Sequence, residues 1–536
     1  MRALRLLSTL TALALGASAC AGDADGGYYE PGPDGRYAPP PMSSGAPAAD
    51  AGVAPGEEPE DVDSYEDVGT NPWTEVGHDP FSTFAADVDT ASYDIFVRDV
   101  GTYTTLPNPA SVRLEEYVNY FDYAYPAPEP GADVPFAVHL GLADHPMGRQ
   151  HAQLRVGIQA EAPPEFTKLP TNLVFLIDTS GSMSSDDKLP LVKRILTQTL
   201  DQLDPNDTVS IVTYAGSTGV ALEPTSDRAA IRRAIDSFSS GGSTAGAAGI
   251  QLAYQQAEAG FIDGGFNHVV LCTDGDFNVG VSSTDALVEL IEEKREGGVT
   301  LTALGFGRGN LNDAMMERVS NAGNGIYSVI ANETHADRYA AERMLRTIQH
   351  VAKDMKIQVE FNPEHVLAYR LLGYENRAIA DMDFRDDTVD AGEVGAGHRV
   401  TALYELILAG QSIPMVEGAP EVESGEPVEG EREIEAGELV RVKVRWKDLQ
   451  ATAEDPAWET TASLTPDDVA ADASDDDFLF ASAVAALAEL LHDSPYASLD
   501  ELDRIESIFA AQADRDRDRG ELYDLFLVAR PMLEGR

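Results

Sequence analysis

Between residues 171 and 330 the sequence alternates strictly between short apolar runs and longer amphipathic segments, and this alternation permits few folds. The apolar runs, which predict strands, are 172–178, 208–216, 268–276, 300–307 and 325–330. The amphipathic segments, which predict helices, are 188–203, 228–238, 244–260, 284–298 and 311–323. Continuous apolar strands between amphipathic helices predict a mostly parallel sheet covered on both faces. We therefore expect a doubly wound, Rossmann-like α/β domain over residues 168–335, with ligands at the carboxyl ends of its strands.

Hydroxyl and carboxyl groups follow the predicted strand ends. The strand NLVFLID ends at Asp178, and Ser180 and Ser182 follow at alternate positions, so an extended loop can aim all three side chains to one side. Thr244 stands after a Gly-Gly turn at the start of a predicted helix, and Asp274 stands at the end of another strand. These five residues are the candidate site because parallel strands bring their carboxyl ends to one edge.

The chemistry of these side chains predicts a hard divalent cation. Two Ser, one Thr and two Asp offer only oxygen atoms, which suit the octahedral shell of Mg²⁺ or Mn²⁺. Zinc would favour His or Cys ligands. A cation would also relieve the repulsion between two neighbouring carboxylates.

At these residues the sequence resembles the von Willebrand factor type A domain, whose metal-ion-dependent adhesion site reads Asp-x-Ser-x-Ser, a distant Thr and a distant Asp. Asp178, Ser180, Ser182, Thr244 and Asp274 match those positions in order. The resemblance implies that the two serines and usually the threonine contact the metal, while the aspartates often act through water. It also implies that an acidic residue of a protein partner completes the metal shell.

The flanking sequence is similar to a family of bacterial von Willebrand A lipoproteins with an N-terminal and a C-terminal module. We expect the N-terminal module over residues 81–165, with one amphipathic helix in 111–126 and half-buried strands at 136–144 and 151–161. The C-terminal module covers 336–536. A helix is expected near 334–353, an antiparallel β-rich part over 355–450 that resembles a β-sandwich, and packed helices over 475–532.

The first twenty residues have the pattern of a secretory signal. Arg2 and Arg5 precede a short apolar run that is too short to span a bilayer, and small residues lead to Cys20. The segment resembles a lipoprotein signal with lipid-modified Cys20, although Ala17 stands where Leu is preferred; an ordinary signal cleaved near Ala19 is the alternative. Residues 21–80 are rich in Gly, Pro, Ala and acids, which predicts a disordered acidic tether. We therefore expect a lipid-anchored protein of the cell envelope, at the outer membrane and on its periplasmic or surface side.

The formal net charge of −53 bears on the choice of partners. So acidic a chain disfavours nucleic acid as a partner and favours cations. Only two cysteines occur, and if Cys20 carries lipid, no disulfide can form; Cys272 lies in an apolar run and is interpreted as a buried small hydrophobe.

Three functional hypotheses follow. The first is a binding protein that captures an acidic group of a protein partner through the metal. The second is a scaffold of an envelope complex in which the metal is structural. The third, a hydrolase that activates water on the metal, is disfavoured because the sequence lacks Gly-Lys, His-Glu-x-x-His and Gly-x-Ser-x-Gly motifs and gives Ser180 no evident base. We therefore expect no enzymatic activity.

Overall fold

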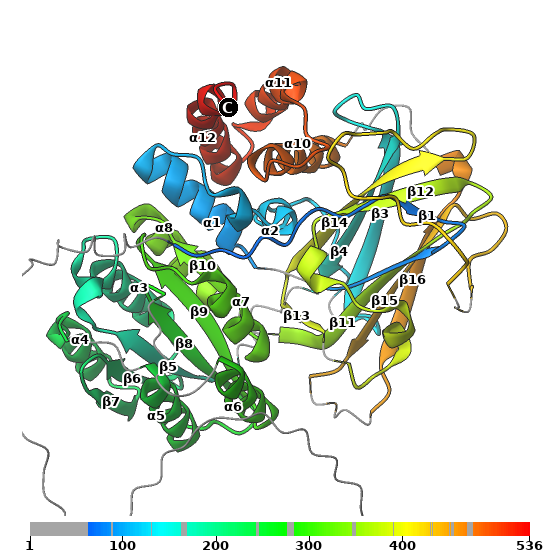
Figure 1. Ribbon diagram of the computed structural model, residues 1–536. Coiled ribbons are helices and arrows are strands. Elements are labelled where there is room, and N and C mark those ends of the chain that lie inside the picture. The colour runs from blue at the N-terminus through cyan, green and yellow to red at the C-terminus, as the bar shows by residue number, and fades with distance from the viewer. Residues whose placement is uncertain are drawn as a thin grey trace, which may run out of the picture. The chain divides into compact units, whose positions relative to one another are not determined.

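The computed structural model describes most of the chain from residue 63 onward (Figure 1). The described residues all belong to one compact unit, Glu60–Arg536. They are 63–86, 89–129, 131–161, 169–242, 246–275, 284–345, 350–389, 391–428, 430, 432–449, 451, 455–468 and 475–536. Cys20 and the residues before it lie outside these ranges, as does Thr244.

The predicted doubly wound sheet is confirmed. Its six strands lie in the order β10-β9-β8-β5-β6-β7, and all neighbours are parallel except β6 and β7. The strands are β5 (Thr171–Asp178), β6 (Thr208–Tyr214), β7 (Thr218–Thr225), β8 (Phe266–Thr273), β9 (Val299–Phe306) and β10 (Tyr327–Ile330). The antiparallel edge strand β7 was not predicted, because it carries few buried side chains and contains Pro224.

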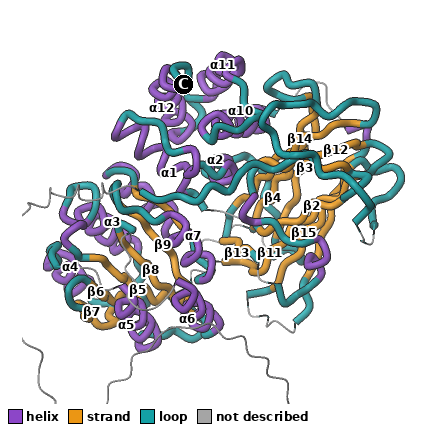
Figure 2. Tube along the Cα trace, in the orientation of Figure 1, coloured by secondary structure: helices purple, strands orange, loops and turns teal. Residues whose placement is uncertain are grey.

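Helices cover both faces of this sheet, and each face has its own apolar core (Figures 1 and 2). One face packs against α3 (Leu189–Gln202), α4 (Arg228–Ser237) and α8 (Glu333–Arg338), which continues into the π-helical η4 (Tyr339–Arg343). The other packs against α5 (Gly246–Ala259), α6 (Thr284–Glu296) and α7 (Asp313–Ala322). The helix expected near 334–353 is shorter than predicted, since a strand begins at His350.

Two further sheets form a β-sandwich around a shared apolar core. The first sheet has the order β1-β12-β14-β4-β3; the second has β13-β11-β15-β16, and β2 also pairs with β11. The strands are β1 (Thr74–Glu75), β2 (Phe81–Ala85), β3 (Phe136–Asp144), β4 (Ala152–Ala160), β11 (His350–Phe361), β12 (Val366–Leu372), β13 (Gly392–Gly395), β14 (Arg399–Leu408), β15 (Val440–Lys447) and β16 (Trp458–Leu464). The short 3₁₀ turns η5 (Glu375–Arg377) and η6 (Asp381–Arg385) lie between β12 and β13, and η7 (Pro466–Asp468) follows β16.

The sandwich is built from both ends of the sequence, so the α/β domain is an insertion between β4 and β11. β2 and β4, from the N-terminal side, pair with β11 and β14 from the C-terminal side. Residues 63–80, which composition assigned to the tether, also belong to the fold. Trp73 is buried, and β1 pairs with β12.

Helices from the two sides of the insertion also share one core. They are α1 (Ala91–Arg98), the π-helical η1 (Asp99–Tyr103), α2 (Leu114–Asn119), α10 (Asp476–Leu491), α11 (Leu502–Gln512) and α12 (Arg517–Leu533). The 3₁₀ turn η2 (Pro109–Ser111) precedes α2, and the 3₁₀ turn η8 (Leu499–Glu501) precedes α11. No helix among the described residues is both long enough and apolar enough to cross a lipid bilayer.

Candidate metal centre

Two acidic residues meet at one edge of the parallel sheet. β5 and β8 are adjacent and in parallel register, with Ile177 opposite Cys272, so their carboxyl ends coincide. β5 ends at Asp178, and Asp274 directly follows β8. Both side chains are buried. The structure thus places these two predicted site residues together at the edge where a doubly wound sheet binds ligands.

Asp178 is oriented by hydrogen bonds from its own loop and from the neighbouring strand. The backbone N–H of Ser180 donates to Oδ1 at 2.7 Å, and the Thr273 hydroxyl donates to Oδ2 at 3.4 Å. Burial raises the pKa of Asp178 to about 6; the hydrogen bonds from Ser180 oppose this shift and the Asp274 charge adds to it. A buried carboxylate beside a second carboxylate is a favourable place for a cation.

The two predicted serines lie together in the loop after β5. Their Oγ atoms are 2.9 Å apart, Ser180 is buried, and Ser182 is half-buried within the 3₁₀ turn η3 (Gly181–Ser184). The segment that follows α4 holds this loop in place, since the Gly181 N–H donates to the Gly242 carbonyl at 3.0 Å. This contact brings the described segment that ends at residue 242 beside the serines, while Thr244 itself lies outside the described residues.

Lys188 also lies at the candidate centre, and the sequence did not indicate it. Its Nζ donates to Oδ2 of Asp274 at 3.0 Å, and both side chains are buried. Asn310 Nδ2 also approaches the same oxygen at 3.5 Å. The lysine follows Asp186 and Asp187 in the sequence, and nothing there indicates a partner 86 residues away.

The described donors fit a hard divalent cation. Asp178, Ser180, Ser182 and Asp274 present carboxylate and hydroxyl oxygens from two loops at one sheet edge. Such oxygens suit Mg²⁺ or Mn²⁺, and the donor set contains no nitrogen or sulfur that would favour zinc.

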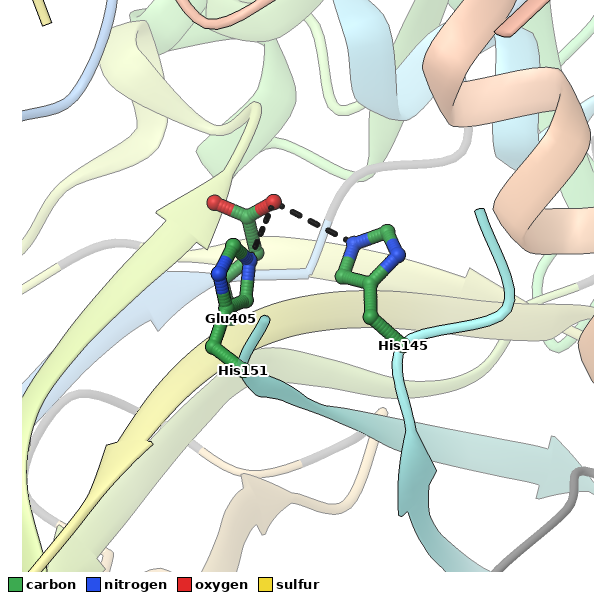
Figure 3. Close-up of side chains that lie close together, drawn as sticks. All are labelled: His145, His151 and Glu405. Atoms are coloured by element: carbon green, nitrogen blue, oxygen red, sulfur yellow. Dashed lines mark ion pairs between the residues drawn. The ribbon is translucent and has the colours of Figure 1, made fainter. Parts of the chain in front are cut away.

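A second cluster of possible metal ligands lies in the β-sandwich (Figure 3). Figure 3 shows Nε2 of His145 and Nε2 of His151 facing the same oxygen of Glu405, at 3.2 and 3.0 Å. The three ligand atoms lie close enough together to share one ion. His145 and His151 are close in sequence, but Glu405 lies far from both, so no metal-ligand spacing indicates the cluster.

Two observations argue against a metal in this second cluster. Nδ1 of His145 accepts the Met147 N–H at 3.1 Å, so in the neutral ring the proton is on Nε2, where a metal would have to bind. The Glu405 oxygen that faces both rings also accepts from Arg149 Nη1 at 2.6 Å. Burial lowers the pKa of His145 to about 4, despite its contact with Glu405. The cluster is therefore a buried ion network with a neutral His145.

This network joins the sandwich to the helices. Arg370 donates to Glu405 at 2.8 Å and to Glu489 at 2.7 Å. Arg149 reaches Glu405, Glu489 and Glu501 at 2.6, 2.8 and 2.8 Å. Because Glu405 is on β14 and Glu489 on α10, these bonds tie the helical layer to the first sheet.

Comparison with known proteins agrees with the fold. The family model described as von Willebrand factor type A domain matches residues 172–349, which defines the class of the inserted domain. A second model, described as von Willebrand factor, matches residues 59–155, and a third, described as the C-terminal part of Uncharacterized protein YfbK, matches residues 346–531. Proteins of this class are interaction modules, and that general role follows for this chain.

Individual relatives identify the family to which the whole chain belongs. The Escherichia coli (strain K12) protein described as Uncharacterized protein YfbK is 40% identical over 451 residues, covering 82% of this chain and 76% of the relative. The chain therefore belongs to the YfbK family of von Willebrand factor type A proteins. The Synechocystis protein sll0103 is 31% identical over 186 residues, covering 34% of this chain and 43% of that protein. A solved von Willebrand factor type A structure from Catenulispora acidiphila is 16% identical with a TM-score of 0.41, covering 76% of this chain and 92% of that one.

Proposed function

We propose that this protein binds an acidic group of a protein partner through Mg²⁺ or Mn²⁺ held at the edge of the inserted domain. The residues that would hold the cation are Asp178, Ser180, Ser182, Thr244 and Asp274. The observation that carries the proposal is the convergence of two buried carboxylates with two serine hydroxyls 2.9 Å apart at the carboxyl ends of β5 and β8. The bound cation would supply a positive charge that a partner's Asp or Glu can approach.

The net charge of the chain supports a metal-bridged contact. Because the formal net charge of the chain is −53, direct contact with an acidic partner would be repulsive. A cation between two carboxylates attracts both of them. Within the described ranges, the Ser180 hydroxyl contacts the hydroxyl of Ser182 and not a histidine. The arrangement therefore favours binding over nucleophilic catalysis.

We further propose that lipid-modified Cys20 anchors the protein in the cell envelope, at the outer membrane. This part rests on the signal-like N-terminus, with Arg2 and Arg5, an apolar run and small residues before Cys20. Mass spectrometry of the protein recovered from membranes tests it: a diacylglyceryl adduct on Cys20 is expected, and a mature chain without lipid would contradict the anchor.

The metal function is tested by Mn²⁺ titration of the full chain, followed by metal-dependent binding to an immobilised Asp-containing peptide. Ser180→Ala should lose most Mn²⁺ affinity and peptide capture. Ser184→Ala is the matched control, because Ser184 is exposed at the end of the same 3₁₀ turn and should change neither. Equal Mn²⁺ binding by both variants would contradict the proposed site.

A scaffold function with a structural metal is the second candidate. It is favoured by the ion pairs that join the inserted domain to its flanks, including Arg113 with Asp313 at 2.6 Å and Arg377 with Glu317 at 2.7 Å. EDTA separates the two functions, since a scaffold keeps its partners after chelation and a metal-bridged binding protein releases them.

A further inference from the structure

The buried lysine beside the candidate metal centre is held in a fixed position. Lys188 directly precedes α3, is 7% exposed, and places Nζ 3.0 Å from Oδ2 of Asp274. A long, flexible side chain is normally free to extend its ammonium into water. Here the ammonium is instead buried against Asp274.

Gly307 explains why the lysine stays in this position. A Cβ on Gly307 would lie 2.4, 2.7 and 3.0 Å from Cε, Cγ and Cδ of Lys188, so only glycine leaves room for the stem. Gly307 has a φ of +74°, which other residues rarely adopt, and its carbonyl accepts from Arg98 Nη1 at 2.9 Å. The loop after β9 is thus fixed by the flanking helix α1 and in turn confines Lys188.

The lysine changes the charge of the site. With Asp178 and Asp274 ionised, the two carboxylates and one ammonium sum to one negative charge, so a bound divalent cation leaves one positive charge. A single carboxylate ligand then brings the sum to zero. Without the lysine the loaded site would already be neutral, and a carboxylate ligand would make it negative. Nearby Asp187 is at the rim, where it accepts from Ser185 and Tyr103.

We propose that Lys188 is a built-in counter-charge that weakens divalent-cation binding at this centre and keeps the loaded centre cationic, so that it selects an anionic ligand. The ligand half of this inference rests on the proposed function, whereas the metal half does not. The competing explanation is that the Lys188–Asp274 pair only stabilises the fold. The two explanations predict opposite changes in metal affinity when Lys188 is replaced. Loss of a structural pair weakens metal binding, whereas loss of a counter-charge strengthens it.

The metal half is tested by Mn²⁺ titration of the full chain and of Lys188→Met and Lys188→Gln. Glutamine can still donate to Asp274, so it removes the charge while keeping a hydrogen bond. Both variants should bind Mn²⁺ about tenfold more tightly or better, since a nearby positive charge no longer opposes the cation. Lys294→Met is the control, because Lys294 forms a 3.0 Å pair with Glu258 on the surface of α5 and α6.

Folding is checked by circular dichroism and thermal unfolding in EDTA. If Lys188→Met fails to fold, Lys188→Gln carries the test. Unchanged or weaker Mn²⁺ binding by the folded variants overturns the metal half and assigns Lys188 a structural role. Tighter binding by both supports the counter-charge.

The ligand half uses acetate as the probe, with Mn²⁺ saturating and water proton relaxation as the readout. The parent should bind acetate more tightly than Lys188→Gln by several-fold. Acetate binding that is equal in both overturns the ligand half while leaving the proposed function intact. Absence of acetate binding to the parent, with tighter Mn²⁺ binding in the variants, contradicts the proposed function and leaves the metal half standing.

Discussion

Two buried clusters of charge in this protein differ in how their carboxylates are paired. In the sandwich network, Glu405 and Glu489 are each bound by Arg149 and Arg370 at 2.6–2.8 Å. At the sheet edge, the acids are contacted by one lysine and by small hydroxyl and amide groups. The carboxylates of the first cluster already have two arginines as counter-charges, whereas the acids of the second would gain from a cation.

Residue types that commonly bind metals do not by themselves indicate a metal site. Whether their ligand atoms already have other partners is stronger evidence. His145, His151 and Glu405 have the chemistry of a zinc site, yet Arg149 already binds the shared Glu405 oxygen. The Met147 N–H donates to Nδ1 of His145, which puts the proton of the neutral ring on Nε2, where a metal would bind. Asp178 and the serines have weaker individual affinity for metals, but they lie together at a ligand-binding sheet edge. Four experiments test this contrast.

The largest expected effect is the loss of stability caused by Arg370→Met. Arg370 is buried and bridges Glu405 and Glu489, so its loss removes one of the two arginines that these buried carboxylates share and leaves them with Arg149. Breaking such a pair should lower the free energy of unfolding by about 3–5 kcal/mol. Urea unfolding measures the loss. Arg194→Met, at an exposed ion pair, is the control and should have little effect. A minor change in Arg370→Met would mean that the network contributes little.

The second effect is metal-dependent stabilisation of the sheet edge. Mg²⁺ at about 100 times its dissociation constant should raise the free energy of unfolding by about 2.7 kcal/mol. Asp178→Asn should abolish this gain, yet in EDTA it should be at least as stable as the parent, because it removes a buried charge beside Asp274. Unfolding with and without Mg²⁺ gives both values, and a Mg²⁺ gain that persists in Asp178→Asn would place the cation elsewhere.

The third effect is a pH dependence of the sandwich network. The folded pKa of His145 is lowered to about 4 by burial, so the unfolded chain takes up a proton at a higher pH than the folded one. Stability is therefore lost as the pH falls from the unfolded pKa of about 6.5 toward 4, by about 2 kcal/mol between about pH 7.5 and about pH 5. In His145→Gln this part of the pH dependence should disappear. A stability difference between parent and variant that is independent of pH would contradict a neutral buried His145.

The smallest expected effect is that of zinc on the sandwich network. Because the His145 ring and Glu405 are already engaged, His145→Gln and the parent should show the same thermal shift on addition of Zn²⁺. A zinc-dependent rise in the unfolding temperature that is present in the parent and lost in the variant would falsify the ion-network interpretation and restore a metal site.

The parallel sheet and most of its site were predictable because their signals are local. Asp178, Ser180 and Ser182 directly follow an apolar strand, and parallel pairing then determines where Asp274 lies. Lys188 was not predictable, since its role depends on Gly307 and on a partner 86 residues away. The ordered part of the predicted tether was not predictable from composition. Trp73 is buried there, but a single apolar residue changes little in the composition of an acidic, Gly- and Pro-rich stretch.

The sandwich was only coarsely predictable for a related reason. Alternating patterns in 136–161 and 356–448 indicated strands, but a strand pattern does not identify its partner. The pairing of β2 with β11 and of β4 with β14 joins segments on opposite sides of the inserted domain. His145, His151 and Glu405 meet only through that pairing.

The insertion has a consequence for the order of events during synthesis. β2 and β4 leave the ribosome before the inserted domain, whereas their partners β11 and β14 follow it. The strands β5 to β10 are complete by Ile330, so the inserted domain can fold while its host still has unpaired edges. Closure of the sandwich then waits for long-range pairing, which is slow. Its early strands are therefore the segments of the nascent chain most exposed to aggregation and to chaperones.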